Sequence, residues 1–409
     1  MDILSAHYRQ LLGLDENWTV ESVDLSTEEK RVLIALKHVS SSVVCPECSV
    51  SCGLKDHAPP RRWRHLDTMQ FETVLEAAVP RAKCPQCGVK TCQVPWADKH
   101  SRFTLLFEAF AIKVLDASSS VSRAAALLGL GWDAVHEIMK RAVRRGLARR
   151  QVDAVHYVGI DEKSFGRGQD YVSLMTDLTG SRVLEVVPGR DEQAANQLWN
   201  SLPKSQRDQI QAVAIDMWQA FEKSVRVHAP QADIVHDKFH ISKHLNEAVD
   251  RVRRTEHKQL KSQGDERLTG SKQLWLFRRE NIREERKAEF EALKKQKLKT
   301  ARAWAIKDSF DGFWTYCYAG HAKNFFHDWY AWASRCRLQP VVRVAKMIKK
   351  RLGNVLTYFK HHITNALTEG FNSRIQNLKS NARGFRNFDN YRIRILFFCG
   401  KLDLQPVGL

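Results

Sequence analysis

Three short apolar runs follow one another between residues 155 and 188, and turn residues separate them. They read VHYVGID at 155–161, DYVSLMTDL at 170–178 and RVLEVVP at 182–188. Short apolar runs bounded by glycine and polar turn residues are typical of β-strands, and consecutive strands joined by short turns pair side by side. The pattern therefore predicts an antiparallel meander of three strands.

Helical and apolar segments alternate after this meander. Residues 191–202 predict a helix with an acidic first turn, and residues 209–218 predict a fourth strand that again runs into an aspartate. A helical stretch follows, and residues 232–240 predict a fifth strand. The resulting order, β-β-β-α-β-α-β-α, indicates an α/β domain whose later strands are joined by helical crossovers, as in parallel sheets.

Upstream of the strands, residues 118–150 have the pattern of two short helices. Serines predict the start of the first helix, Gly129 and Gly131 interrupt it, and a second helix is expected from near Trp132 to about Arg145. Small residues, a short glycine turn and a second helix are typical of a helix-turn-helix, although an αα-hairpin that only packs has the same pattern. The basic residues favour DNA, and the candidate DNA contacts are His136, Lys140, Arg141 and Arg144.

Length and charge narrow the class of protein. The chain has 409 residues, which predicts two to four domains, and Lys plus Arg number 65 against 46 Asp plus Glu. The net charge of +19 favours a polyanionic partner, either nucleic acid or an acidic membrane surface. No apolar run approaches the length of a spanning helix, and the first residues contain no secretion signal. We therefore expect a cytoplasmic protein that binds nucleic acid and no membrane.

The cysteines predict a zinc site. In a reducing compartment, the nine cysteines are thiols or metal ligands rather than disulfides. Cys45 and Cys48 form one CxxC pair, and Cys84 and Cys87 form a second, each beside turn-forming residues. Two such pairs close a tetrahedral Zn²⁺ site, so we expect one structural zinc ion rather than four ordinary buried cysteines. Substitute ligands would be Cys52, Cys92, His57 and His65.

A basic and aromatic stretch, RRWRH at 61–65, lies between the two cysteine pairs. Such a stretch is either a solvated surface or a set of phosphate contacts, and the net charge of the chain makes the second interpretation at least as strong. Arg61, Arg62 and Arg64 are therefore candidate DNA contacts.

Two aspartates end predicted strands. Asp161 closes the first strand and Asp216 follows the apolar part of the fourth. If these strands are neighbours in the sheet, their carboxylates meet at its edge and require a cation between them. Mg²⁺ prefers such hard oxygen ligands, and a pair of metal ions suits cleavage or transfer of a phosphodiester. The alternative is two unrelated aspartates that only form turns.

Several motifs together resemble the ISL3 family of bacterial insertion-sequence transposases. They are the paired CxxC module, the helix-turn-helix, GIDEKSF, AIDMW, VHDKFHISKHLNEAVDRVRR and TEGFNSRIQNLKSNARGFRNFDNYRIRILF. The resemblance runs from the zinc knuckles to about residue 400. It implies that the α/β domain has the RNase H-like fold of DDE transposases, with an aspartate at the ends of its first and fourth strands.

The same resemblance supplies a third acid on a helix after the sheet, and the matching residue is Glu369. Without the resemblance, Glu369 would be read as a solvent-exposed residue of a basic helix. Asp237 is a rival to which we assign a supporting role, and Glu162 is a weaker candidate because it alternates to the other side of its strand. His240 and His244 are expected to pack at a helix start, with DNA contacts as the alternative. The candidate DNA contacts near Glu369 are Asn365, Asn372, Lys379 and Arg383.

These inferences predict a multidomain chain. It comprises a zinc-binding N-terminal module (1–100), a helix-turn-helix region (101–150), the first part of an RNase H-like catalytic core (151–255), an all-helical insertion (256–350) and the last part of the core with the catalytic Glu helix (351–409).

The predicted function is that of a nucleoid-associated DNA transposase. It would bind the inverted-repeat ends of its insertion sequence and target DNA as a homodimer. Asp161, Asp216 and Glu369 would hold two Mg²⁺ ions, or Mn²⁺, for strand cleavage and strand transfer. The alternatives are a catalytically silent, zinc-containing DNA-binding regulator derived from a transposase, and a related nuclease that cuts without transfer.

Overall fold

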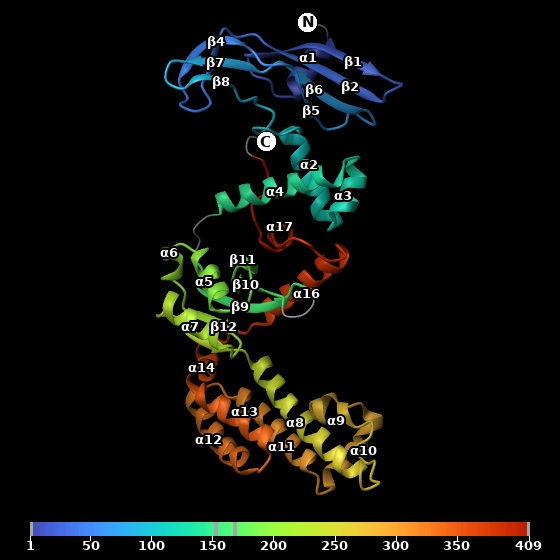
Figure 1. Cartoon of the computed structure of the whole chain (residues 1–409), viewed down its shortest axis with the longest axis vertical. Helices are drawn as coiled ribbons and strands as arrows, with labels where there is room; N and C mark the ends of the chain where they lie inside the picture. The colour runs from blue at the N-terminus through green and yellow to red at the C-terminus, as the bar shows by residue number, and fades with distance from the viewer. Residues whose placement is uncertain (1–2, 151–153, 167–169, 407–409) are drawn as a thin grey trace. The chain divides into compact units, whose positions relative to one another are not determined.

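The chain divides into two compact units in the computed structural model, which describes residues 3–150, 154–166 and 170–406 (Figure 1). The first unit contains residues 1–150 together with 401–409, and the second contains residues 151–400. The predicted boundary after residue 150 adjoins residues 151–153, and the last predicted segment ends in 407–409; both stretches lie outside the described residues. The finer division into five segments stays a prediction.

Two four-stranded sheets follow a short helix, α1 (Ile3–Leu11), in the first unit. The first sheet has the order β1-β2-β6-β5, with bounds Trp18–Ser26, Arg31–His38, Glu72–Ala77 and Arg61–Arg64. The second has the order β3-β4-β7-β8, with bounds Ser42–Val44, Ser51–His57, Pro80–Cys84 and Gly88–Thr91. Trp96 packs edge-on against Trp18 and Trp63, with ring centroids 4.7 and 5.6 Å away, and these rings anchor the core of the first sheet.

The helix-turn-helix pattern folds as expected into α3 (Val121–Leu128) and α4 (Trp132–Arg149), after α2 (Leu105–Ser118). Ser120 caps α3 by accepting a hydrogen bond from the backbone N–H of Arg123, and Gly129 ends it with a φ of 63°. The second helix starts where the sequence predicts but runs beyond Arg145. The C-terminal segment stabilises this extension, because a Cβ on Gly146 would lie 2.6 Å from Leu402 Cβ.

A five-stranded mixed sheet forms the centre of the second unit, with the order β11-β10-β9-β12-β13. Its strands are β9 (Tyr157–Ser164), β10 (Tyr171–Asp177), β11 (Arg182–Pro188), β12 (Ala212–Ile215) and β13 (Asp233–His236). The first three are antiparallel neighbours, whereas β12 is parallel to both β9 and β13. Helices α5 (Glu192–Asn200), α6 (Lys204–Arg207) and α7 (Gln219–His228) lie between the later strands. The predicted meander and parallel crossovers are confirmed.

Two predicted strand ends are wrong. The first strand does not stop at Asp161 but continues to Ser164, because its antiparallel pairing with β10 continues, with Asp161 opposite Leu174. The fifth strand stops at His236 rather than at residue 240. Asp237 caps a helix there, since its Oδ1 accepts a hydrogen bond from the next-but-one backbone N–H.

Helices make up the chain from residue 238 to 361, wider than the predicted 256–350. They are α8 (Lys238–Lys261), α9 (Lys272–Leu276), η1 (Arg279–Asn281), α10 (Glu284–Lys295), α11 (Lys299–Phe310), η2 (Asp311–Thr315), α12 (Ala319–Arg335), α13 (Gln339–Lys350), α14 (Leu352–Leu356) and α15 (Tyr358–His361). They share an aromatic core in which Phe290 contacts Trp275 and Trp304 edge-on. Across the described part of the chain, no helix has the length and apolar character needed to span a membrane.

Two further helices, α16 (Ala366–Asn381) and α17 (Phe388–Cys399), return to the sheet and contact β9 and β11 (Figure 1). The approach of α16 is close, because a Cβ on Gly159 would lie 2.3 Å from Thr368 Oγ1 and 2.7 Å from Asn365 Oδ1. Side chains two residues apart on a strand share a face. Asp161 therefore faces α16, whereas Val158 and Ile160 join the core on the side of α5 and α7.

Candidate active site and zinc centre

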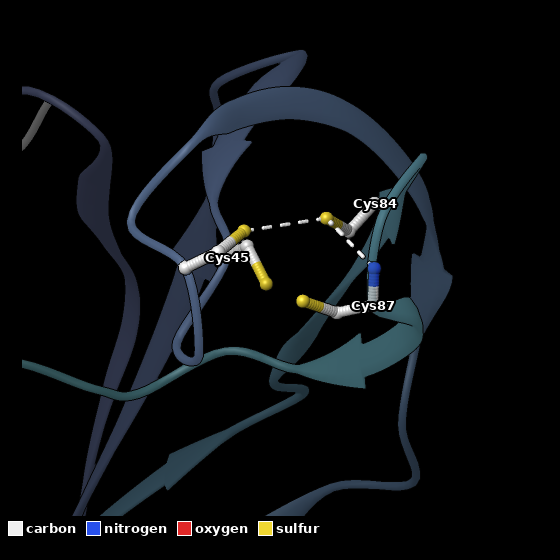
Figure 2. Close-up of side chains that lie close together, drawn as sticks. Cys45, Cys84 and Cys87 are labelled. Carbon is white, nitrogen blue, oxygen red and sulfur yellow. Dashed lines mark hydrogen bonds between the residues drawn. The ribbon is translucent and has the colours of Figure 1, made fainter.

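Four cysteines of the first unit converge on one point. Turns bring Cys45 and Cys48 opposite Cys84 and Cys87, and their sulfur atoms all lie within 4.8 Å of one another. Figure 2 shows the thiols of Cys45, Cys84 and Cys87 directed toward a common centre. The Sγ atoms of Cys48 and Cys84 are 3.5 Å apart. This arrangement has the number and type of ligands of a structural Zn²⁺ site.

The electrostatics of the cluster also fit a cation. Hydrogen bonds from backbone N–H groups, chiefly that of Cys87, lower the pKa of the Cys84 thiol to about 7. The neighbouring Cys48 thiol and burial raise the pKa of Cys87 to about 12, since a second thiolate beside the first is unfavourable. A bound Zn²⁺ removes this conflict by stabilising all four thiolates. The possible substitute ligands lie outside the cluster, and Cys52 donates to the carbonyl of Val43.

Three aspartates lie level with one another at the edge of the mixed sheet. β12 pairs with β9 through Ala214 and Gly159, and with β13 through Ile215 and His236. Continued by one or two residues, this register aligns the three aspartates Asp161, Asp216 and Asp237. The carboxyl ends of parallel strands meet at one sheet edge, which explains the alignment.

Asp161, which is buried, and Asp216, which is partly buried, share this edge. Asp161 is 7% exposed; its Oδ1 accepts from the backbone N–H of Glu162 at 2.9 Å and its Oδ2 from Asn372 Nδ2 at 2.7 Å. Burial, followed by the charge of Glu162, raises the pKa of Asp161 to about 7. Burial also raises the pKa of Asp216, whose Oδ1 accepts from the backbone N–H of Trp218. Such carboxylates favour a bound cation, because a cation offsets the cost of burying their charge.

Glu369 lies in the first turn of α16, with Asp237 and His240 as its neighbours. One ligand atom from each of these three residues lies within 4.8 Å of the other two. Burial and the charge of Asp237 raise the pKa of Glu369. Asp237, whose Oδ2 lies 3.5 Å from His240 Nδ1, raises the pKa of His240, and the charges of Asp161 and Asp216 raise it further.

The sequence analysis did not predict that His240 lies beside Asp237 and Glu369, because it expected this histidine to pack. The signal was present, because His240 follows Asp237 by three residues, which is one turn of helix. Extending the fifth strand to residue 240 hid this spacing, since a strand would turn the two side chains to opposite faces.

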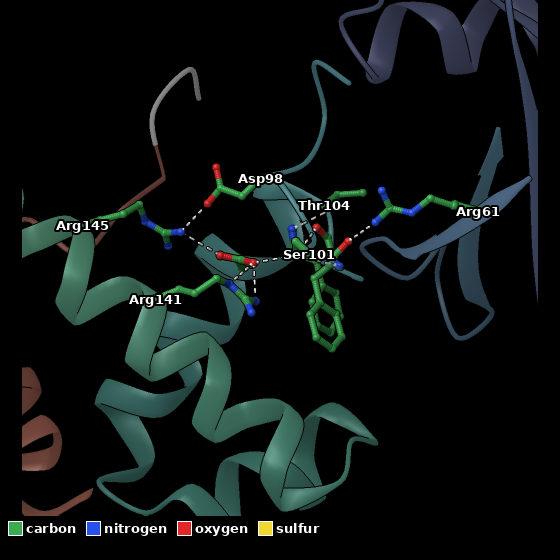
Figure 3. A network of polar contacts seen from close by, with 9 residues as sticks. Arg61, Asp98, Ser101, Thr104, Arg141 and Arg145 are labelled. Carbon is green, nitrogen blue, oxygen red and sulfur yellow. Dashed lines mark hydrogen bonds and ion pairs between the residues drawn. The ribbon is translucent and has the colours of Figure 1, made fainter. Parts of the chain in front are cut away.

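The predicted recognition helix uses much of its charge internally (Figure 3). Arg141 donates two hydrogen bonds to the fully buried Glu108 of α2, at 3.0 and 2.5 Å. Arg145 donates to the same carboxylate at 3.0 Å and to Asp98 at 2.7 Å. His136 is buried and stacks on the ring of Trp132. These contacts favour packing for Arg141 and His136 and leave Lys140 partly exposed and Arg144 exposed.

The three arginines of the RRWRH stretch are also engaged. Arg61 lies over the ring of Trp63 and donates to the carbonyl of Ser101 (Figure 3). Arg62 pairs with Glu76 and Arg64 with Asp67, each at 2.5 Å. Of the three, Arg62 and Arg64 belong to the face of β5 opposite Trp63, and the side chain of Arg62 is 64% exposed.

On α16, the predicted contacts occupy different positions. Asn365 is fully buried and donates to the carbonyl of Ile160, so it fixes the helix on the strand. Asn372 holds Asp161, and Lys379 donates to the carbonyl of Ser164. Arg383 lies beyond the helix end with a φ of 54°. The structure therefore brings Asn372 into the acid site and leaves the DNA contacts as predictions.

Four clustered cysteines, a helix-turn-helix and a mixed sheet with acids at its edge are the parts expected of a DNA transposase, and the comparisons with known proteins agree. Residues 158–395 match the ISL3 DDE transposase family, residues 92–143 match the helix-turn-helix domain of transposase family ISL3, and residues 41–87 match the zinc-finger of the IS204/IS1001/IS1096/IS1165 transposases. The first match covers more than half of the chain, so the protein belongs to the ISL3 transposase family.

Two relatives are similar over almost their whole length. The chain is 28% identical over 398 residues to the transposase for insertion sequence element IS1001 of Bordetella parapertussis, covering 96% of this chain and 98% of the relative. It is 26% identical over 412 residues to the transposase for insertion sequence element IS1557 of Mycobacterium tuberculosis, covering 93% and 92%. The family membership and the helix-turn-helix indicate a DNA-binding protein, and the zinc-finger match agrees with the four clustered cysteines.

Proposed function

We propose that the protein is a DDE transposase that binds the inverted-repeat ends of its insertion sequence and cuts and joins DNA at the edge of the mixed sheet. The observation that carries the proposal is the level placement of Asp161 and Asp216 on neighbouring strands, beneath the helix that bears Glu369. The strand order, with three antiparallel strands followed by two parallel ones, supports an RNase H-like fold. The helices between β13 and α16 would then be an insertion into that fold.

Asp161, Asp216 and Glu369 would hold two Mg²⁺ ions, or Mn²⁺, in this proposal. These three carboxylates fit such ions, because burial raises the pKa of each in the absence of a cation. Divalent cations supply the positive charge that favours attack by water or a 3′-OH on phosphorus and departure of the leaving oxygen. Asn372 keeps Asp161 oriented by donating a hydrogen bond to its Oδ2. No covalent protein–DNA intermediate is required.

The remaining parts would locate the DNA. The zinc module and the helix-turn-helix would hold the element ends, and a homodimer would bring two ends together. The proposed DNA contacts are Arg61, Arg62, Arg64, His136, Lys140, Arg141, Arg144, Asn365, Asn372, Lys379 and Arg383. Among those on α4, Arg144 is best placed by its exposure.

The test uses DNA from both flanks of the gene, searched for inverted repeats. Wild type, Asp161→Asn and Asp216→Asn are incubated with this DNA in Mg²⁺ or in EDTA, and products are separated on a denaturing gel. We expect nicks at the repeat boundaries that require Mg²⁺ and are absent in both variants. Asp208→Asn is the matched control, because Asp208 is exposed and forms a surface ion pair with Lys204, away from the acid site.

Other outcomes favour the other candidates. Tight binding without cleavage, equal in wild type and the two active-site variants, would contradict the proposal and favour the catalytically silent regulator. Cleavage without joined products from supplied 3′-OH ends would favour a nuclease.

A further inference from the structure

We propose that Asp237, His240 and Glu369 form a mixed nitrogen–oxygen site for a divalent first-row transition metal ion, such as Mn²⁺, beside the Asp161–Asp216 pair. The inference rests on the proposed function in one respect, since Glu369 serves in both. It goes further by giving the Glu369 side of the active site two additional ligands and a metal preference.

Two segments far apart in the chain bring the ligands together. Asp237 follows the last strand of the sheet, His240 lies one turn into α8, and Glu369 comes from the first turn of α16. One ligand atom from each lies within 4.8 Å of the others. Two ligands of a single ion with bonds of about 2.1 Å can be at most about 4.2 Å apart, so small side-chain shifts suffice.

The burial and hydrogen bonding of Asp237 indicate a bound ligand independently of this clustering. Its side chain is 2% exposed, and its Oδ1 caps α8. Its Oδ2 is buried and, within the described residues, has no hydrogen-bond partner; it faces His240 Nδ1 at 3.5 Å. A buried carboxylate oxygen without a partner has lost its contacts with water and gained none in return, which is unfavourable. A metal ion between Asp237 and His240 would satisfy both atoms.

A simple ion pair between His240 and Asp237 is the competing explanation. The charges of Asp161 and Asp216, from two neighbouring strands, also act on His240. Glu369, across from them on α16, is acidic as well, and Lys243 is the cation that acts on it besides His240. His240 and Lys243 together carry less positive charge than the four carboxylates carry negative charge, so a divalent ion fits this setting better.

The ligand types set the metal preference. Mg²⁺ demands oxygen ligands in near-ideal geometry, whereas imidazole nitrogen suits transition metal ions. A site with one imidazole and two carboxylates therefore binds Mn²⁺ more tightly than Mg²⁺. This preference distinguishes it from the all-carboxylate pair of Asp161 and Asp216.

The test measures Mn²⁺ bound to the full-length, zinc-loaded protein by pulsed electron paramagnetic resonance, which detects coupling of Mn²⁺ to an imidazole nitrogen. We expect this nitrogen coupling in wild type and its loss in His240→Gln. His244→Gln, one turn further along α8, is the matched control and should keep it. Asp237→Asn should weaken Mn²⁺ binding at least about tenfold. Circular dichroism melting establishes that each variant is folded.

The outcomes separate this inference from the proposed function. Mn²⁺ bound without nitrogen coupling in wild type, or coupling that persists in His240→Gln, would overturn the mixed site even if DNA cleavage is normal. Coupling that persists in Asp161→Asn while cleavage is lost would support both. Nitrogen coupling in a wild-type protein that does not cut DNA would contradict the transposase mechanism and support the metal site.

Discussion

Individual buried side chains in this protein hold charges whose partners come from distant parts of the chain. Lys307 in α11 is such a case, because its Nζ donates to the carbonyls of Leu276 and Phe277 at 3.0 Å each. Glu256 in α8 is another, since it accepts hydrogen bonds from the first backbone N–H groups of α11 at 2.7 Å. Lys307 binds carbonyls at the C-terminal end of α9, and Glu256 binds N–H groups at the N-terminal end of α11. Backbone groups at helix ends lack partners within the helix and need such contacts.

The buried lysine predicts a pH dependence of stability. Burial lowers the pKa of Lys307 to about 8 from its ordinary 10.5. Between these values the unfolded chain binds the proton and the folded chain does not, so stability rises with pH. The unfolding free energy of wild type relative to Lys307→Met should therefore increase from pH 8 to 10, by at most on the order of 3 kcal/mol. Chemical denaturation across this range measures it, and a difference that stays flat would contradict it.

The clustered thiols predict a metal dependence. Cys84→Ser should lose the bound zinc and lower the melting temperature, because the free energy of zinc binding contributes to folding of such small modules. Zinc content by mass spectrometry and thermal unfolding measure the two effects. Cys317→Ser is the control, since Cys317 is exposed and outside the cluster. Unchanged zinc content in Cys84→Ser would disprove the four-cysteine site.

Helices and strands in the second unit are matched to each other by close contacts. The N-terminal turn of α16 lies against β9 at Gly159, where no side chain fits. This contact positions Glu369 and Asn372 over the sheet edge, and Asn372 in turn holds Asp161. The geometry of the acid site therefore depends on the packing between one strand and one helix.

The contact at Gly159 predicts the effect of a single methyl group. Gly159→Ala should destabilise the protein by about 1–3 kcal/mol, because its Cβ would overlap Thr368 Oγ1. It should also reduce DNA cleavage by displacing α16. Gly53→Ala, on a strand of the first unit where a Cβ has open space, is the matched control. Thermal unfolding and the cleavage assay measure both, and equal behaviour of the two variants would show that α16 is not tightly held.

Across the whole molecule, the net charge of +19 and the family membership indicate binding to DNA phosphates. Part of this positive charge is neutralised within the protein, because Arg141 and Arg145 form ion pairs with the buried Glu108. The number of basic residues free to contact DNA is therefore smaller than the net charge suggests. The exposed arginines are the better candidates for DNA contacts.

Salt dependence of DNA binding tests this distinction. Arg144→Ala should weaken binding to the element ends and lower the slope of log affinity against log salt by about 1, as expected for one lost phosphate contact. Fluorescence anisotropy at several salt concentrations measures the slope. Lys204→Ala is the control, because Lys204 is exposed and lies outside the predicted DNA contacts. A slope unchanged in Arg144→Ala would make α4 a packing helix.

Local patterns in the sequence determined the two CxxC pairs, the helix-turn-helix and the order of strands and helices. Each depends on residues near one another in the chain, where spacing and turn residues decide the structure. Only the tertiary structure placed Asp237 level with Asp216, grouped His240 with Glu369, and bound Arg141 to Glu108. These depend on strand register and helix packing between segments far apart in the sequence, and such long-range contacts leave no periodic signal in the residues themselves.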